Sequence, residues 1–280
     1  MQHFRFLLRY AILLGAFGAL QLGTCAKAAD LHVLATTALK PFFEQVTPDF
    51  EKATGHRLMF LWGASYGTAS DALPVRIKNG EAADVVIMIG KSLDEQIKLG
   101  NLRRGTAAYL ATSRTGLAIK AGAPQPDITS VDNLRHTLLA AKSVAYSSGV
   151  SGIYVAGTMF PQLGIADQLK SKSVVVEAPE LVGHALLRGD AEVGLQQMSE
   201  LLAVPGIQIV GPLPDSVQRV NVIAAAVANN AEHPQAAEAL IAFLQSAKAA
   251  QKLKDSGFDP IISQQLQHAS IGRNQATGSL

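Results

Sequence analysis

The chain has 280 residues, with 24 lysines and arginines against 22 acidic residues and a single cysteine. Its first 28 residues hold three of the basic residues and no acidic ones, so the remainder carries a formal charge of −1. Without a basic surplus, and without clusters of basic and aromatic residues, the chain is not expected to bind nucleic acid. Its length is enough to bury a complete core and to divide into two lobes.

The first 28 residues predict a secretory signal sequence. Arg5 and Arg9 precede a short apolar run, residues 11–23, and small residues lead to a cleavage position after Ala28. The apolar run is shorter than a membrane-spanning helix, which disfavours a retained membrane anchor. We therefore expect a periplasmic protein that is secreted through a cleaved signal peptide.

Cys25 offers an alternative to cleavage after Ala28, because a cysteine near the end of a signal can be a lipid-attachment site. Thr24 is a poor residue before such a cysteine, so lipoprotein anchoring is the less favoured interpretation. After cleavage the mature chain has no cysteine, and an ordinary apolar core rather than disulfides must stabilise it.

The first third of the mature chain alternates between predicted strands and helices. The predicted strands are 31–36, 57–63 and 83–90, and the predicted helices are 40–55, 70–80 and 92–102. The helix at 40–55 places bulky apolar residues on one side and has Gly55 as a stop signal. Residues 83–90 are apolar throughout, as in a strand that is covered on both faces. This alternation predicts a parallel α/β layer.

The rest of the chain repeats the pattern and predicts a second α/β unit. Further strands are predicted at 115–122, 143–147, 172–178, within 191–200, 207–214 and 220–228. Further helices are predicted at 130–141, 151–164, 180–189 and 233–257. Residues beyond about 260 lose apolar periodicity and predict a frayed tail.

Two candidate crossings divide the chain, one near residues 109–117 and one near residues 206–222. If the chain leaves the first unit at one and returns at the other, two lobes are joined by a hinge of two crossings. The predicted organisation is a signal peptide at 1–28, lobe 1 from 29–112 plus 215–260, lobe 2 from 113–214, and a tail at 261–280.

Hydroxyl-rich loops follow the predicted strands. In an open α/β sheet, ligands bind outside the carboxyl ends of the strands, beside helix N-termini. Hydroxyls, amides and helix N–H groups bind oxyanions there, although the same residues are ordinary helix caps and turns. Several such loops at one sheet edge favour an anion-binding site. Its candidate residues are Thr36, Thr37, Ser65, Tyr66, Ser147, Ser148, Ser151, Gly152 and Gln197.

No metal or cofactor motif stands out. The histidines show no pairing four residues apart and no surrounding acidic cluster. The chain also lacks a nucleophile elbow, a Walker loop and a dinucleotide-binding fingerprint. We therefore expect neither a metal nor a cofactor.

The chain resembles the periplasmic solute-binding proteins of the type II fold, in the branch that includes molybdate-binding proteins. The resemblance is carried by residues 34–55, 83–102 and 183–200. It implies two α/β lobes, an interlobe cleft, a monomer, and an ABC permease as partner if the protein serves transport. The molybdate pattern usually has a serine in the first loop, a run of serines in the second and a tyrosine near the lobe 2 strand end. At these places this chain has Thr36 and Thr37, residues 63–67 (Gly-Ala-Ser-Tyr-Gly), and Gln197.

The chain is also similar to the bacterial aconitate isomerases, secreted enzymes built on the same fold. This similarity is carried by residues 74–90, 143–173 and 192–214. It implies a polycarboxylate ligand and the interconversion of cis- and trans-aconitate by an allylic proton shift. The alternative is a binding protein that feeds an ABC transporter with a tricarboxylate or a molybdate-like oxyanion. A third interpretation is a sensor or orphan binding protein without either role.

The sequence leaves the proton-transferring residue open. The catalytic candidates are Tyr66, Tyr154 and His184, although Tyr154 and His184 fall within predicted helices, where packing roles are common. Glu200 and Lys40 are further titratable groups near predicted strand ends or helix starts. Lys40, Arg76 and Arg114 are equally ambiguous as cations for a trianionic ligand.

Overall fold

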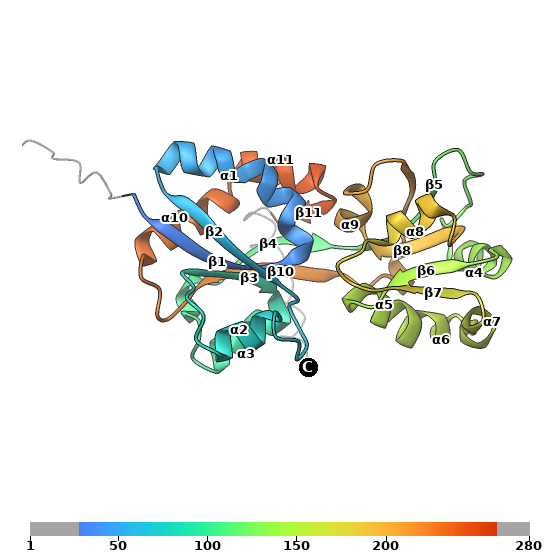
Figure 1. Ribbon diagram of the computed structural model, residues 1–280, viewed down its shortest axis with the longest axis horizontal. Coiled ribbons are helices and arrows are strands. Elements are labelled where there is room, and N and C mark those ends of the chain that lie inside the picture. The colour runs from blue at the N-terminus through green and yellow to red at the C-terminus, as the bar shows by residue number, and fades with distance from the viewer. Residues whose placement is uncertain (1–27, 262–280) are drawn as a thin grey trace, which may run out of the picture.

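The computed structural model describes residues 28–261, which form two lobes side by side (Figure 1). The predicted signal sequence lies outside the described residues except for Ala28, and so does the predicted tail except for Ile261. Among the helices of residues 28–261, none is long and apolar enough to span a bilayer.

Lobe 1 is built on a six-stranded sheet with the order β11-β4-β10-β3-β1-β2. Its strands are β1 (Asp30–Thr36), β2 (Arg57–Gly63), β3 (Val85–Ile89), β4 (Ala108–Ser113), β10 (Asn221–Val227) and β11 (Phe258–Pro260). Its helices are α1 (Lys40–Thr54), α2 (Leu73–Lys78), α3 (Gly90–Lys98), α10 (Pro234–Leu244) and α11 (Ala247–Asp255), with the single turns η1 (Thr37–Leu39) and η2 (Arg104–Thr106).

Lobe 2 is built on a five-stranded sheet with the order β7-β6-β8-β5-β9. Its strands are β5 (Thr115–Lys120), β6 (Val144–Ser147), β7 (Ser173–Val176), β8 (Val193–Gln197) and β9 (Ile207–Pro212). Its helices are α4 (Val131–Ala140), α5 (Val150–Tyr154), the π-helical turn η3 (Val155–Met159), α6 (Phe160–Gln162), α7 (Ala166–Lys170), α8 (Val182–Arg188) and α9 (Met198–Leu202). A single turn, η4 (Asp215–Val217), lies on the return to lobe 1.

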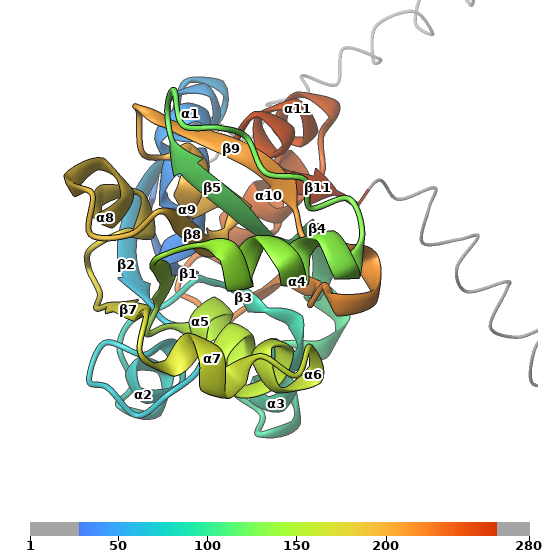
Figure 2. The ribbon, with the colours of Figure 1, turned by 90° about the vertical axis from the view of Figure 1, so that its right-hand side faces the viewer.

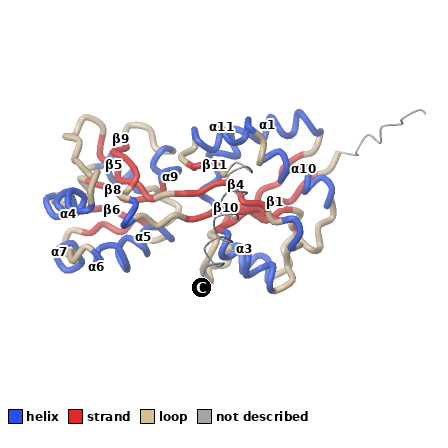
Figure 3. Tube along the Cα trace, turned by 180° about the vertical axis from the view of Figure 1, so that it is seen from behind, coloured by secondary structure: helices blue, strands red, loops and turns tan. Residues whose placement is uncertain are grey.

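Helices cover both faces of each sheet, so each lobe has two apolar layers (Figure 3). In lobe 1, α1, α10 and α11 pack on one face, and α2 and α3 pack on the other. In lobe 2, α4 and the segment from α5 to α7 cover one face, while α8 and α9 cover the opposite one (Figure 2). The two-lobe α/β fold class is therefore confirmed.

Helix α1 shows why the local pattern predicted the element well. Phe42, Phe43 and Phe50 are fully buried on its inner side, and each such side chain contributes about 1.5–3 kcal/mol of burial free energy. The helix ends where Gly55 adopts a left-handed conformation, with φ of +75°, which glycine reaches without a steric penalty. In β3, residues 85–88 are all buried, as expected of a strand covered on both faces.

Several features differ from the sequence prediction, which does not include the short helices α7 and α9. The strands β4 and β11 were not predicted, and β10 lies antiparallel between β3 and β4, so lobe 1 is a mixed sheet. The predicted helix at 233–257 is two helices, because the chain breaks at Gln245 and Ser246 starts α11 by accepting a hydrogen bond from the Ala249 N–H. The predicted helix at 151–164 contains the π-helical turn η3.

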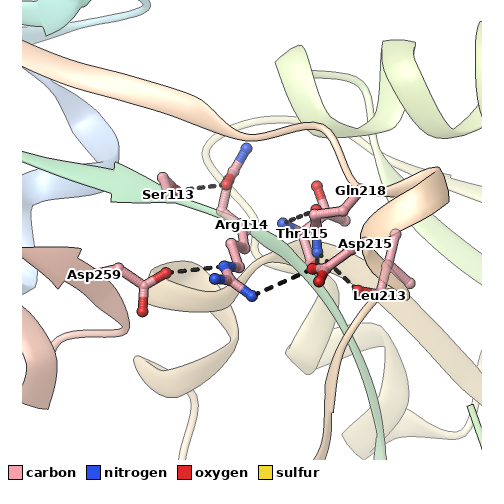
Figure 4. A network of polar contacts seen from close by, with 8 residues as sticks. Ser113, Arg114, Thr115, Leu213, Asp215, Gln218 and Asp259 are labelled. Atoms are coloured by element: carbon pink, nitrogen blue, oxygen red, sulfur yellow. Dashed lines mark hydrogen bonds and ion pairs between the residues drawn. The ribbon is translucent and has the colours of Figure 1, made fainter. Parts of the chain in front are cut away.

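The chain passes between the lobes twice, and Gln218 joins the two crossings (Figure 4). The first crossing is the short link between β4 and β5, and the second runs from β9 through η4 to β10. The Gln218 amide nitrogen donates hydrogen bonds to the carbonyls of Thr115 (2.8 Å) and Leu213 (3.3 Å). Its side-chain oxygen accepts one from the Thr115 N–H at 2.9 Å. A single amide side chain therefore holds both crossings in register.

Arg114 adds ion pairs at the same place (Figure 4). Its guanidinium lies 2.9 Å from the carboxylate of Asp259 in β11, the strand beside β4 in the sheet, and 3.7 Å from Asp215 in η4. Asp215 is almost fully exposed, so water screens that pair and its contribution to stability is small. The geometry nonetheless neutralises Arg114 within the hinge.

Candidate functional site

The carboxyl ends of the parallel strands in each lobe point toward the other lobe. In lobe 1, β4 runs in the same direction as β1 and β3, because both β3 and β4 are antiparallel to β10. Strand β4 ends at Ser113, directly before the first crossing. In lobe 2, Gln197 at the end of β8 pairs with Thr115 at the start of β5, just after that crossing. The ends of β1, β2, β3, β6 and β8 therefore lie at one place, the interlobe edge, where open α/β sheets bind ligands.

In lobe 1, Ser65 lies in a rigid buried setting after β2. Its hydroxyl oxygen accepts a hydrogen bond from the Ile89 N–H at 3.1 Å, and its carbonyl accepts one from the Ser92 hydroxyl at 2.7 Å. The Ser65 hydroxyl hydrogen thus remains available to donate to a ligand. At the end of β1, Thr36 is buried and makes no capping hydrogen bond with its side chain, while Thr37 is exposed.

In lobe 2, the loop from β6 to α5 folds tightly around Ser147. The hydroxyls of Ser147 and Ser151 lie 3.1 Å apart, and both side chains are buried. Gly152 is required here, because a Cβ at this position would lie 1.5 Å from the Ser147 carbonyl oxygen. The Ser148 N–H donates to the Val176 carbonyl at 2.9 Å, so this backbone group is already satisfied. What Ser148 offers a ligand is its side chain.

Gln197 connects the end of β8 to lobe 1. Its side-chain oxygen accepts a hydrogen bond of 2.6 Å from the Ser113 hydroxyl, and both residues are buried. The neighbouring Gln196 points to the opposite face, where its side-chain oxygen accepts the Val182 N–H at the start of α8. Gln197 is therefore a contact between the lobes at the predicted site.

The three candidate proton carriers have different surroundings. Tyr154 ends α5, and its hydroxyl donates a 3.0 Å hydrogen bond to the Val217 carbonyl of the second crossing. Tyr66 follows Ser65 and is partly buried. Burial raises the pKa of both tyrosines above the ordinary value, so both are neutral phenols at neutral pH. His184 lies exposed in the first turn of α8, after the carboxyl end of β7.

Glu200 is a titratable group with a strongly altered environment. It stands at the third position of α9, three residues after Gln197. Burial raises its pKa to about 7, while hydrogen bonds from the Gln197 backbone and the Gln196 side chain act in the opposite direction. A carboxyl that titrates near neutral pH can both accept and return a proton.

The cations considered from the sequence differ in availability. Arg76 lies 2.6 Å from Glu81, and Arg114 pairs with Asp259, so both already have a carboxylate partner. Lys40 is exposed at the start of α1.

Arg219 is a cation that sequence reasoning missed. It lies on the second crossing, and its guanidinium stands 5.8 Å from the centre of the Tyr154 ring. The surrounding sequence, an irregular link between two strands, gives no local signal for it. The signal that could have identified Arg219 is its position directly before the predicted strand 220–228, where the chain returns to lobe 1.

The structure thus places all nine predicted ligand-binding residues at the interlobe edge. The residues at the strand ends, in the loops that follow them or in the first turn of the next helix are Thr36, Thr37, Ser65, Tyr66, Ser147, Ser148, Ser151, Gly152 and Gln197. Residues 28–261 contain no group of three or more His, Cys, Asp or Glu side chains arranged to hold a metal.

Three hollows lie away from the interlobe edge. One of about 700 Å³ lies between α4 and the amino end of β8, one of about 390 Å³ lies at the amino end of β1, and one of about 260 Å³ lies beside α2 and the carboxyl end of α3. None of the three is lined by a predicted site residue.

Two α/β lobes, joined by two crossings and facing one another with hydroxyl-rich strand ends, define a two-lobe binding protein. The chain belongs to the family of bacterial extracellular solute-binding proteins, whose model matches residues 31–259. Within this family it is similar to the aconitate isomerase of a Pseudomonas species, with 38% identity over 254 residues that cover 89% of this chain and 97% of that protein. It is also similar to the molybdate-binding protein of Azotobacter vinelandii, with 25% identity over 87% of this chain and 95% of that one.

Solved structures support the same fold. The periplasmic molybdate-binding protein of Azotobacter vinelandii superposes with a TM-score of 0.62 and 22% identity, covering 81% of this chain and 98% of that one. The sulfate-binding protein of Mycobacterium tuberculosis superposes with a TM-score of 0.64 and 19% identity, covering 83% and 87%. At these identities the likeness concerns the fold alone.

Proposed function

We propose that this protein is a periplasmic isomerase that interconverts cis- and trans-aconitate, with the polycarboxylate held between the two lobes. The observation that carries this proposal is the 38% identity with an aconitate isomerase, which extends over nearly the whole length of that protein. The aligned region, 89% of this chain, extends over both lobes. A mature, monomeric protein acting in the periplasm is part of the proposal.

The geometry supports an anionic ligand at the interlobe edge. Ser65 retains a free hydroxyl hydrogen on lobe 1, and the side chains of Ser147, Ser148 and Ser151 lie on lobe 2. Hydroxyl donors held on buried, hydrogen-bonded loops bind carboxylate oxygens without reorganisation. Donors from both lobes would favour closure around the ligand.

The reaction sets a further requirement. A base removes a proton from the methylene carbon, the electron pair shifts the double bond by one position, and a proton is delivered to the former alkene carbon. No oxidant or reductant takes part. Such a shift needs a group that is close to half-ionised at the working pH. We assign this role to Glu200, because its pKa is about 7 and it follows Gln197 at the interlobe edge.

The reaction also needs a hydrogen-bond donor that stabilises developing negative charge, and a neutral tyrosine can serve as that donor. Tyr66 and Tyr154 have raised pKa values because of burial, so they donate hydrogen bonds rather than accept protons. Of the two, Tyr66 suits a role near the ligand, because Tyr154 already donates its hydroxyl hydrogen to the Val217 carbonyl. A donor placed at a ligand carboxylate stabilises the negative charge that develops as the proton leaves.

The test is direct. Purified mature protein is incubated with trans-aconitate, and cis-aconitate is followed by chromatography, with heat-inactivated protein as the control. Turnover supports the isomerase. A parallel thermal-shift series with molybdate, citrate and both aconitates identifies ligands independently of turnover.

The second candidate is a binding protein that delivers a tricarboxylate or a molybdate-like oxyanion to an ABC permease. The similarity to the molybdate-binding protein of Azotobacter vinelandii, at 25% sequence identity, favours it. Thermal stabilisation by one of these ligands without turnover would decide for this candidate and against the isomerase.

A further inference from the structure

Arg219 lies at the meeting point of three parts of the molecule. It belongs to the second crossing, its guanidinium stands over the ring of Tyr154 from α5 in lobe 2, and the centre of that ring is 5.8 Å away. The Tyr154 hydroxyl is held by the Val217 carbonyl, two residues before Arg219 in the same crossing. A ring fixed in this way positions a guanidinium, because the ring face attracts a cation.

The charge of Arg219 also acts on Tyr66, in the loop after β2 of lobe 1. Burial is the largest influence on the pKa of Tyr66 and raises it. The negative charge of Glu95 raises this pKa further, and the positive charge of Arg219 lowers it. Arg219 also lowers the pKa of Tyr154 against the effect of burial. The guanidinium is therefore within electrostatic reach of both the loop that holds Ser65 and the helix that begins beside Ser151.

Arg219 has no carboxylate partner among the described residues. Within residues 28–261, no Asp or Glu oxygen lies within 4.0 Å of its guanidinium, whereas Arg76 and Arg114 both have such partners. Glu95 acts on Tyr66 but forms no ion pair with Arg219. The side chain of Arg219 is exposed, so its planar N–H groups are accessible to a ligand from solvent.

We propose that Arg219 binds a carboxylate of the ligand and selects polycarboxylates over compact inorganic oxyanions. A guanidinium matches the two oxygens of a carboxylate with parallel hydrogen bonds. The hydroxyls of the serine loops are neutral hydrogen-bond donors. A ligand with several separated carboxylates also needs a full positive charge at one end. This inference rests on the proposed function, because it names the residue that recognises that function's substrate class.

The test compares Arg219→Gln and Arg219→Lys with the wild type by isothermal titration calorimetry. The ligands are trans-aconitate, citrate and molybdate. The matched control is Arg104→Gln, which removes an exposed arginine from η2 in lobe 1. Loss of a hydrogen-bonded charge pair is expected to weaken aconitate and citrate binding by about ten- to a hundred-fold in Arg219→Gln. Arg219→Lys should keep part of the affinity, because lysine retains the positive charge but cannot pair with both carboxylate oxygens through two parallel hydrogen bonds.

The outcomes separate this inference from the proposed function. Any molybdate affinity of the wild type should be unchanged in Arg219→Gln. Full polycarboxylate affinity in Arg219→Gln would overturn the inference, even if the wild type turns over aconitate. An equal loss for all three ligands would also overturn it, because that pattern indicates a hinge defect rather than selection. A selective loss without any wild-type turnover would uphold the inference and overturn the isomerase. A wild type that binds no polycarboxylate would overturn both.

Discussion

The Ser113 hydroxyl donates a 2.6 Å hydrogen bond to the side-chain oxygen of Gln197, and this bond joins the last residue of β4 in lobe 1 to the last residue of β8 in lobe 2. The two residues are 84 positions apart in the chain, and both are buried. The bond ties lobe 2 to lobe 1 at the predicted ligand site.

Replacing Ser113 by alanine should destabilise the protein. The Gln197 oxygen would remain buried without a donor, which costs about 1–3 kcal/mol. Urea unfolding measures the change in the free energy of unfolding. Ser216→Ala removes an exposed hydroxyl from the second crossing and should change stability by less than about 0.5 kcal/mol. Equal effects of the two substitutions would contradict a role for the Ser113–Gln197 bond.

Replacing Gly152 by alanine should disrupt the loop around Ser147. The new methyl group would lie 1.5 Å from the Ser147 carbonyl oxygen, and relieving such overlap costs roughly 1–3 kcal/mol or more. Gly157→Ala is the matched control in the same helical segment, because a Cβ there meets no atom within 4 Å. Thermal unfolding and ligand titration should show losses for Gly152→Ala alone. Tolerance of alanine at 152 would mean that the close approach is not needed.

Replacing Ser65 or Ser148 by alanine should weaken ligand binding. Each substitution removes a hydroxyl donor, and the expected loss is on the order of 1–3 kcal/mol in binding free energy. Ser65→Ala also leaves the Ile89 N–H without its acceptor. The free energy of unfolding of this variant must therefore be measured together with its affinity for trans-aconitate. Unchanged affinity in both variants would rule out the predicted site.

Glu200 should make stability fall with rising pH. Burial raises its pKa from about 4.5 to about 7 in the folded protein, so the folded state retains a proton that the unfolded state has lost. Its contribution to stability is therefore fully present below pH 4.5 and is lost as the pH rises to about 7. Glu200→Gln should become progressively more stable than the wild type across this window. Glu238→Gln, on the exposed side of α10, serves as the control, and a pH-independent difference for Glu200→Gln would contradict the assignment.

The proposed role of Glu200 in proton transfer predicts a second effect of the same variant. Removing a general base lowers kcat by roughly 10²–10⁴-fold. The KM for trans-aconitate should change little, because glutamine keeps the size of the side chain. In the wild type, activity should rise as the pH approaches 7 and the carboxylate forms. A kcat within a few-fold of the wild type would show that another group moves the proton.

Local patterns determined most of the individual elements. The apolar stripe of α1 with Gly55 at its end, and the uniformly apolar run of β3, identify a helix and a buried strand without tertiary information. These patterns are local because they follow from helix and strand periodicity, in which side chains a few residues apart share a face. The loops that follow the strands were recognisable for the same reason, since their glycines and hydroxyls interrupt the periodicity.

Only the tertiary structure decided how those elements meet. Strand β10 lies between β3 and β4 although the whole of lobe 2 separates it from both in the chain. The Ser113–Gln197 bond, the Gln218 bridge between the crossings and the position of Arg219 over Tyr154 also join distant segments. Such contacts arise from backbone pairing and side-chain burial over long separations, and these leave no periodic trace in the sequence near any one residue. The sequence alone therefore determined the class of fold and the candidate loops, and the tertiary structure decided which polar and charged groups share one site.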